Sequence, residues 1–371
     1  MRTLLWRSAL LAALVGTMSC GEEATDPPAS LRVVAASRGV SIASAAHDEH
    51  ILDDPQYGPV LAREFDSITP YTAMKWGRIH PEPGRYDFTG ADTIVDFATA
   101  HRMRVRGHTL VWGGAADPPN PDYVNNTTSP SELRGLMSDH IQTVMRHYAG
   151  RVDRWDVVNE PLTTFGEIGT TDGLRDSVFL QQLGSGHIAE AFELAHQADP
   201  TARLFVNEVF ALKPGAKQER YFRLVSELLE AKVPLHGVGF QGHLAFLPVA
   251  PPGNVDLPTA EEIEATLRRF AALGVDVELT ELNVHTWRLK GDRGARLEQQ
   301  REIYAGAVRA CVAVPGCRAI TVWLFTDRYP TTLESLFGRD AYPLLFDDNY
   351  APKPAYFGVR DALEGRGSSA A

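Results

Sequence analysis

The chain has 371 residues, of which 44% are hydrophobic and 22% charged, so it is long enough to bury a substantial core as one large domain. It contains 36 Lys and Arg residues against 47 Asp and Glu residues, which gives a formal net charge of −11. This acidic balance, without a run of Lys or Arg, argues against nucleic acid as the main partner. A neutral or apolar substrate fits the composition better.

The first residues have the pattern of a secretory signal peptide. Arg2 and Arg7 precede an apolar run over residues 8–15, which is too short for a comfortable transmembrane span, and small residues follow up to Cys20. Cys20 lies where the lipidated cysteine of a bacterial lipoprotein would lie, although the Leu usual three residues before it is missing. We therefore expect an exported protein that is secreted, periplasmic or anchored at the cell surface through a lipid on Cys20. Simple cleavage nearby is the alternative.

Composition also divides the chain into domain and flanking segments. Residues 1–19 form the expected signal peptide, and residues 20–29, which are acidic, small and proline-bearing, form a flexible linker. One folded domain is expected over residues 30–364, followed by a disordered tail over residues 365–371. We expect a monomer whose only membrane contact is the possible lipid on Cys20.

Short β-rich runs alternate with segments of helical periodicity along the folded part. Strands are expected at residues 39–44, 67–73, 104–111, 154–158, 203–207, 237–242, 275–280 and 319–324. Helices are expected at residues 131–148, 188–198, 216–230, 297–313 and 354–363, and after a capping box formed by Thr259 and Glu262. This alternation predicts an α/β fold, a parallel (β/α)8 TIM barrel. The rival is an open doubly wound sheet, which usually carries a glycine-rich phosphate loop after its first strand, and no such loop follows Ile42.

Two of the expected strands end in a glutamate. The run that begins at Trp155 ends at Glu160, where Pro161 prevents the ladder from continuing, and the run that begins at Val275 ends at Glu281. Functional residues of a parallel barrel lie at the C-terminal ends of its strands, so both carboxylates are expected at one rim. Glycoside hydrolysis needs such a pair, one protonated to donate to the leaving oxygen and one ionised to attack or to activate water. Each glutamate taken alone could be an ordinary solvated strand end.

Further polar and aromatic residues gather at the strand ends: Lys75, Trp76, Arg106, His108, Trp112, Asn159, Asn207, Glu208, Gln241, His243 and Trp323. Trp112 and Trp323 could form flat walls for sugar rings, with core packing as the alternative. The cluster at residues 47–50 lies in an expected polar loop and lacks metal-site spacing, so no metal and no other cofactor is expected. The sequence has no Gly-x-Ser-x-Gly elbow or phosphate loop to support acyl transfer or nucleotide chemistry.

Cys311 and Cys317 flank a turn formed by Pro315 and Gly316. In an oxidising compartment, a local disulfide between these two cysteines is favoured over a metal site, because a metal would need more ligands.

Several motifs, taken together and in order, resemble those of one enzyme family. They are Ile68-Thr69-Pro70 with Met74-Lys75-Trp76, Arg106 to Trp112, Trp155 to Glu160, Gly239 to Leu244, Leu279 to Leu282, Thr321 to Trp323, Pro343 to Phe346 and Lys353 to Tyr356. Residues 39–363 thereby resemble glycoside hydrolase family ten, the retaining endo-β-1,4-xylanases, which fold as (β/α)8 barrels. The cysteine pair also resembles a pair found in some members.

The resemblance implies a role for each matching residue. Glu160 would be the general acid/base, Glu281 the nucleophile, and Asn159 a hydrogen-bond partner of the sugar 2-hydroxyl. The residues implied to line the subsite of cleavage are Lys75, His108, Gln241 and His243, with Trp112 and Trp323 as aromatic walls. The implied reaction is retaining cleavage of a β-1,4-linked xylan-type polysaccharide by double displacement, with the carboxyl groups about 5 to 5.5 Å apart.

The chain departs from the family pattern beside the glycone, the sugar part that the nucleophile would hold. Tyr71 and Thr72 stand where the family usually has Glu and Asn, Ala115 replaces Gln, Asn283 replaces Asp, and Thr331 stands near a missing aromatic residue. These differences remove polar contacts to the glycone but spare both glutamates. Two alternatives therefore accompany the xylanase: a retaining β-glycosidase of this fold with altered glycone specificity, and a non-catalytic cell-surface glycan-binding protein, which would need neither glutamate.

Overall fold

The computed structural model describes residues 29–114, 120–164, 173–245, 257–329 and 341–366. The expected signal peptide, Cys20, most of the expected linker, Ala115, Thr331 and residues 367–371 lie outside this part. Within it, no helix is both long and apolar enough to cross a membrane.

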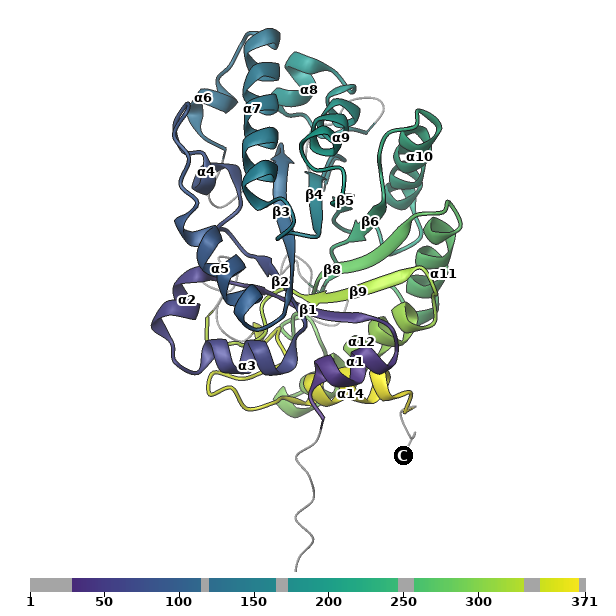
Figure 1. Cartoon of the computed structure of the whole chain (residues 1–371). Helices are drawn as coiled ribbons and strands as arrows, with labels where there is room; N and C mark the ends of the chain where they lie inside the picture. Colours follow the sequence, from purple (N-terminus) through teal and green to yellow (C-terminus); the bar gives the residue numbers. More distant parts are fainter. Residues whose placement is uncertain (1–28, 115–119, 165–172, 246–256, 330–340, 367–371) are drawn as a thin grey trace, which may run out of the picture.

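The strands form one closed, parallel barrel (Figure 1). They are β1 (Ser41–Ala46), β2 (Ser67–Pro70), β3 (Arg104–Trp112), β4 (Arg154–Asn159), β5 (Arg203–Glu208), β6 (Gly237–Phe240), β7 (His243–Leu244), β8 (Asp276–Val284) and β9 (Cys317–Val322). Neighbours follow the order β6-β5-β4-β3-β2-β1-β9-β8, and a further parallel pairing of β6 with β8 closes the ring. The short β7 lies outside the ring and pairs with the last residues of β8. The predicted (β/α)8 barrel is confirmed.

Helices surround this barrel (Figure 1). They are α1 (Leu31–Ser37), α2 (Asp48–Asp53), α3 (Tyr57–Glu64), α4 (Trp76–Ile79), α5 (Thr89–Ala100), α6 (Asp122–Asn125), α7 (Pro130–Tyr148), α8 (Val178–Leu183), α9 (His187–Ala198), α10 (Ala216–Glu230), α11 (Ala260–Ala271), α12 (Arg293–Val312) and α14 (Pro354–Glu364). Because helices cover the outside and side chains fill the inside, β1, β2, β4 and β6 are buried at every position.

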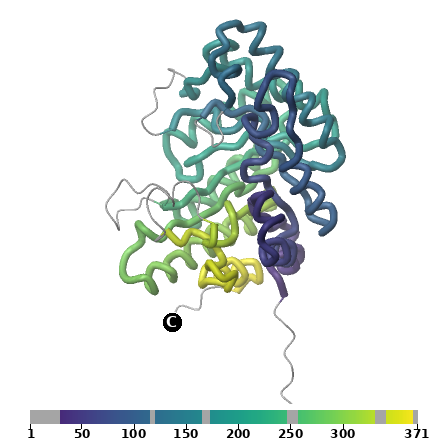
Figure 2. The backbone as a smooth tube through the Cα atoms, turned by 90° about the vertical axis from the view of Figure 1, so that its left-hand side faces the viewer, coloured from purple at the N-terminus to yellow at the C-terminus, as the bar shows by residue number. Residues whose placement is uncertain are grey.

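Helix α11 shows how local sequence fixes an element. The side chain of Thr259 accepts a hydrogen bond from the Glu262 amide, and Glu262 reciprocates, so the predicted capping box is present. Ile263, Leu267 and Phe270 then recur on one face and are all buried. Helix α14 brings the end of the chain back beside α1 near its start, as both views show (Figures 1 and 2).

The structure corrects three local expectations. The segment after β1 is the helix α2 and not a polar loop; Asp48 and Glu49 occupy its first turn, where carboxylates interact favourably with the helix dipole. Strand β2 ends at Pro70, earlier than predicted. Strand β8 does not end at Glu281 but continues to Val284, because β7 supplies a further partner for its last residues.

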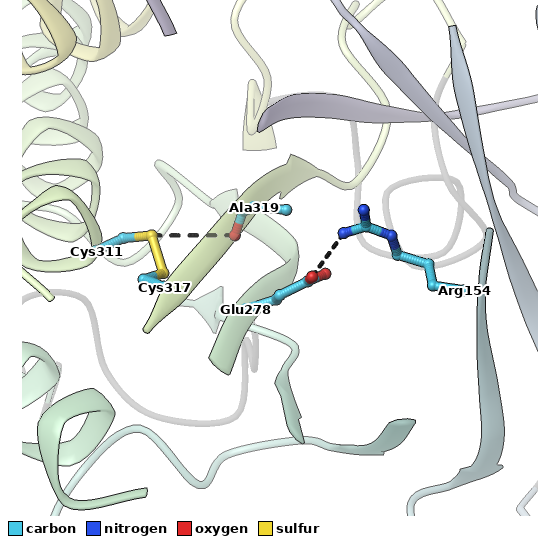
Figure 3. Close-up of a disulfide and its surroundings, with 5 residues drawn as sticks. All are labelled: Arg154, Glu278, Cys311, Cys317 and Ala319. Atoms are coloured by element: carbon cyan, nitrogen blue, oxygen red, sulfur yellow. Dashed lines mark hydrogen bonds and ion pairs between the residues drawn. A yellow bond between two sulfur atoms is a disulfide. The ribbon is translucent and has the colours of Figure 1, made fainter. Parts of the chain in front are cut away.

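Four charged side chains interact inside the barrel, near the N-terminal ends of β3, β4 and β8. Arg106 Nη1 lies 2.8 Å from Glu278 Oε2, Arg154 Nη1 lies 2.6 Å from Glu278 Oε1, and Arg106 also pairs with Asp156 (Figure 3 shows Arg154 and Glu278). All four side chains are buried. Burial acts to raise the pKa of Asp156, but the Arg106 guanidinium and the hydrogen bond with His108 together hold that pKa below its usual value. We infer that this set is ionised and mutually neutralised.

The predicted disulfide is present. It joins Cys311 near the end of α12 to Cys317 at the start of β9, with an S–S distance of 1.98 Å (Figure 3). The bond therefore ties an outer helix to the barrel strand that follows it.

Candidate active site

Glu160 and Glu281 both lie at the C-terminal rim of the barrel. Glu160 follows the last residue of β4 and has a φ of 50°, in the left-handed region, while its amide donates to the Asn207 carbonyl at 2.8 Å. Glu281 lies within β8, and its amide donates to the Gln241 carbonyl at 2.8 Å. A non-glycine residue in the left-handed region is held there by its surroundings, so the direction of the Glu160 side chain is fixed by the fold.

Glu281 is buried and receives hydrogen bonds at both oxygens. Asn207 Nδ2 donates to Oε1 at 2.7 Å, and His243 Nε2 lies 3.1 Å from Oε2. Burial acts to raise the pKa of this carboxyl, but the hydrogen bond from His243 and the nearby His108 together hold it below its usual value. The site therefore favours an ionised Glu281.

Glu160 is contacted by three side chains from different segments. Gln241 Nε2 donates to Oε1 at 2.8 Å, Trp112 Nε1 donates to Oε2 at 3.2 Å, and Arg175 Nη2 lies 3.0 Å from Oε2. Arg175 also donates from Nε to the Glu160 carbonyl at 2.9 Å. The Glu160 side chain is 15% exposed, against 6% for Glu281, so it is the more accessible of the two carboxylates.

Asn207 links the strands that carry both glutamates. Besides Glu281, its Nδ2 donates to Asn159 Oδ1 at 2.9 Å, and its Oδ1 accepts from Thr280 Oγ1 at 2.6 Å. Gln241 Nε2 reaches Asn159 Oδ1 as well, at 3.5 Å. Asn159 is thereby oriented between the two carboxylates.

The remaining predicted residues complete the same cluster. His108 Nδ1 lies 2.9 Å from Asp156 Oδ2, and its ring meets the edge of Trp323 at 5.3 Å between centroids. Lys75 Nζ lies 5.3 Å from the centroid of Trp112. The structure therefore brings together all the predicted site residues, namely Lys75, His108, Trp112, Asn159, Glu160, Gln241, His243, Glu281 and Trp323.

Tyr71, one of the departures from the family pattern, has an aromatic environment. Its ring lies 5.3 Å from that of Trp323 and 4.4 Å from that of His47, and Lys75 Nζ lies 5.2 Å above it. At position 71 the site therefore presents an aromatic ring where the family pattern has a Glu.

Arg175 escaped the sequence-based prediction, and Asn207 was expected at a strand end but was given no role in the site. Arg175 lies in a loop with no periodic pattern, and nothing in the sequence links it to Glu160 across 15 positions. Asn207 did carry a signal, because it ends an apolar strand as Asn159 does. Its neighbour Glu208 is fully buried, accepts from the Leu162 amide at 3.0 Å and so fixes the turn after Glu160.

Glu208 also has an unusual ionisation. Burial raises its pKa to about 7, although Lys217 Nζ, 3.0 Å from Oε1, opposes the shift.

Among the described residues, no group of three or more His, Cys, Asp and Glu is placed to hold a metal ion.

A closed parallel barrel with two hydrogen-bonded glutamates at its C-terminal rim is the arrangement expected of a glycoside hydrolase of the (β/α)8 class. The model of glycosyl hydrolase family 10 matches residues 30–362, and the chain belongs to this family. It is 35% identical over 359 residues to endo-1,4-beta-xylanase B of Thermotoga neapolitana, covering 96% of this chain and 97% of the relative. It is 39% identical over 313 residues to endo-1,4-beta-xylanase A of Humicola insolens, covering 83% and 77%.

Solved structures agree with these relatives. Xylanase 10B of Thermotoga petrophila in complex with xylobiose superposes with a TM-score of 0.81 at 34% identity, covering 92% of this chain and 98% of that one. The endo-1,4-beta-xylanase XylE of Penicillium canescens gives 0.81 at 29% identity, covering 92% and 99%. The predicted family and hydrolase class are confirmed, and a non-catalytic glycan-binding role is not favoured.

Proposed function

We propose that this protein is a retaining endo-β-1,4-xylanase, in which Glu281 is the nucleophile and Glu160 the general acid/base. The observation that carries the proposal is the difference between the two carboxylates. Glu281 is buried with a lowered pKa, as an ionised nucleophile requires, whereas Glu160 is the more accessible carboxylate, as a group that exchanges protons with the leaving oxygen and with water requires. The xylan backbone is proposed from the relatives named above.

The reaction proceeds in two displacements. In the first, a Glu281 oxygen bonds to the anomeric carbon while the leaving oxygen takes a proton from Glu160. In the second, Glu160 accepts a proton from water, the water oxygen bonds to the anomeric carbon, and Glu281 departs as a carboxylate. Each step inverts the anomeric centre, so the product keeps the β configuration.

The surrounding side chains hold the sugar. Asn159, whose side-chain oxygen accepts a hydrogen bond from Asn207, would bind the 2-hydroxyl. His108, Lys75, Gln241 and His243 supply polar contacts around the cleaved bond, and Trp112 and Trp323 supply apolar walls, because a pyranose ring packs its C–H face on aromatic rings.

Purified protein should be tested on xylan, cellulose, mannan and mixed-linkage glucan, with detection of reducing ends and proton NMR of the first products. We expect internal cleavage of xylan with β-anomers appearing before mutarotation. Products that appear first as α-anomers would overturn retention. Hydrolysis of another backbone without xylan would overturn the substrate, and hydrolysis of none would overturn the activity.

We further propose that the chain acts as an exported monomer with a signal peptide over residues 1–19, a flexible linker over 20–29, the catalytic domain over 30–364 and a disordered tail. Its N-terminal sequence supports export, with lipid attachment at Cys20. Fractionation of cells that express the full chain and a Cys20→Ser variant tests this. We expect the variant to leave the membrane fraction; a wild-type protein already free of the membrane would rule out the anchor.

A further inference from the structure

The segment after Glu160 forms a short antiparallel pairing with the segment that ends at Arg175. The Thr163 amide donates to the Gly173 carbonyl at 3.0 Å, and the Arg175 amide donates to the Pro161 carbonyl at 2.8 Å. These two hydrogen bonds place the backbone of Arg175 beside Glu160. Contacts of the Arg175 side chain then decide where its guanidinium lies.

Glu208 supports this pairing from the end of β5. Leu162 lies between the two hydrogen bonds of the pairing, opposite Leu174, so its own amide points away from that partner. Glu208 Oε2 accepts a hydrogen bond from this amide at 3.0 Å. Glu208 Oε1 accepts from the Val209 amide at 2.9 Å and lies 3.0 Å from Lys217 Nζ. Three donors therefore meet one fully buried carboxyl group, whose two oxygens can accept from all of them.

Lys217 extends this support to Arg175. It lies in the first turn of α10, and its Nζ lies 3.1 Å from Thr164 Oγ1 as well as near Glu208. The same hydroxyl oxygen accepts from Arg175 Nη2 at 3.0 Å, and that nitrogen also lies 3.0 Å from Glu160 Oε2. A hydroxyl oxygen has two lone pairs and can accept from both cations at once. An unbroken series of contacts therefore joins the buried carboxyl group to the proposed acid/base.

The charges along this series alternate. Lys217 and Arg175 both point at one neutral hydroxyl, and the two cations would repel each other if neither had a carboxylate beside it. Their side chains are 17% and 9% exposed, so little water screens them. Glu208 offsets the charge of Lys217, and this allows the ammonium group to stay close to the guanidinium.

We propose that Lys217, held by Glu208, is a positioning residue for the acid/base: through the Thr164 hydroxyl it keeps the Arg175 guanidinium on Glu160 whether or not Glu160 carries a proton. The inference rests on the proposed role of Glu160. The contact between Thr164 and Arg175 involves a neutral acceptor, so it does not depend on the charge of Glu160.

This positioning matters when Glu160 gives up its proton. As the proton moves to the leaving oxygen, negative charge develops on the Glu160 carboxylate, and a guanidinium that is already in place stabilises that charge without rearranging. A leaving group that needs no proton gains nothing from this arrangement. Loss of Lys217 or of the Thr164 hydroxyl should therefore slow only reactions in which Glu160 acts as an acid.

The test compares kcat/KM on two aryl xylobiosides that share their sugars, one with a poor and one with an activated leaving group. Thr164→Val removes the hydroxyl that joins the two cations but keeps both carboxylates and both cations. We expect kcat/KM to fall by about 3- to 30-fold on the poor leaving group and by less than about 2-fold on the activated one. Lys217→Met should give the same pattern. Thr164→Ser, which keeps the hydroxyl, should retain most of the wild-type rate.

Two controls accompany these variants. Lys290→Met removes the charge of an exposed lysine and should leave both rates unchanged. Thermal unfolding checks that each variant is folded. Thr164→Val leaves the buried pair of Glu208 and Lys217 intact, so it decides the question alone if Lys217→Met does not fold.

A double-mutant cycle then separates this inference from the proposed function. Thr164→Val and Lys217→Met are each combined with Arg175→Met, and in that background we expect almost no further loss, because the guanidinium through which they act is gone. The same fold-loss in both backgrounds, or an equal loss on the two aryl substrates, would overturn this inference alone. An equal loss on the two substrates in Glu160→Ala would instead overturn the proposed role of Glu160.

Discussion

The two carboxylates of the site are built in different ways. Glu281 lies inside the strand β8, and the side chains that bind its oxygens come from two other strands, Asn207 from β5 and His243 from β7. Glu160 follows the end of its strand in a left-handed conformation and is bound partly by Arg175 from a loop. On the proposed roles, the carboxylate that must stay ionised is held within the sheet, whereas the carboxylate that must exchange a proton lies at the edge of the sheet.

Removing the carboxylate of Glu281 should have the largest effect on activity. Glu281→Ala should lower kcat on every substrate by about five to six orders of magnitude, because no other group can form the covalent intermediate. Rates on xylan and on an activated aryl xylobioside should fall together. A loss confined to xylan would show that Glu281 does not act as the nucleophile.

Removing the carboxylate of Glu160 should affect natural and activated substrates differently. Glu160→Ala should lower the rate on xylan by about two to four orders of magnitude, because the leaving oxygen loses its proton donor. Release of an activated phenol should continue, since that leaving group needs no proton, and azide should speed turnover in this variant only. The assignment fails if both substrates lose rate equally and azide has no effect.

Substitutions at Arg175 test whether its contact with Glu160 contributes to activity. Hydrogen bonds to charged groups are worth about 1.5 to 3 kcal/mol, so Arg175→Met should lower kcat/KM on xylan by about 10- to 100-fold. Arg175→Lys keeps the charge without the second donor and should lie in between. The loss should be small on activated aryl substrates; an equal loss there would mean that Arg175 serves folding or sugar binding instead.

The disulfide lies away from both carboxylates and should affect stability alone. It closes a loop between positions six apart, for which the chain-entropy model gives about 2 kcal/mol. Cys311→Ser with Cys317→Ser should therefore lose about 2 kcal/mol of unfolding free energy in denaturant titrations, with kcat/KM unchanged. Wild type under reducing conditions is the matched control and should lose the same amount.

Tyr71→Ala should give the smallest effect, because the Tyr71 ring packs on the ring of Trp323, one of the proposed aromatic walls. Aromatic pairs contribute about 0.5 to 1.5 kcal/mol, so Tyr71→Ala should lower kcat/KM on an aryl xylobioside by about 2- to 10-fold. Tyr71→Phe keeps the ring and should retain most of the activity. If an aryl xyloside with one sugar loses as much, Tyr71 supports Trp323 rather than a second sugar.

The sheet was more predictable than the contacts at its edge. The barrel strands could be recognised as short β-rich runs between helical segments, and Pro161 indicated the strand end at Glu160, although the ends of β2 and β8 were misplaced. Strand β7 has two residues, too few for any periodicity, and its pairing extended β8 past Glu281. Arg175 reaches Glu160 only because the chain folds back, and its own segment has no pattern that shows this. Local patterns predict elements, whereas contacts between distant loops depend on the whole fold.

The ionic interior of the barrel has a consequence for how the sequence can evolve. Arg106 and Arg154 balance Asp156 and Glu278, so the four charges sum to zero. Changing any one of these residues leaves a buried charge without its partner, which costs about 3 to 5 kcal/mol, a large share of the stability of a typical domain. Replacing the whole set by apolar residues, in contrast, can be neutral. A lineage cannot reach the apolar solution by single tolerated steps. Single substitutions among these four residues are therefore expected to be destabilising, even though the ionic set as a whole could be replaced.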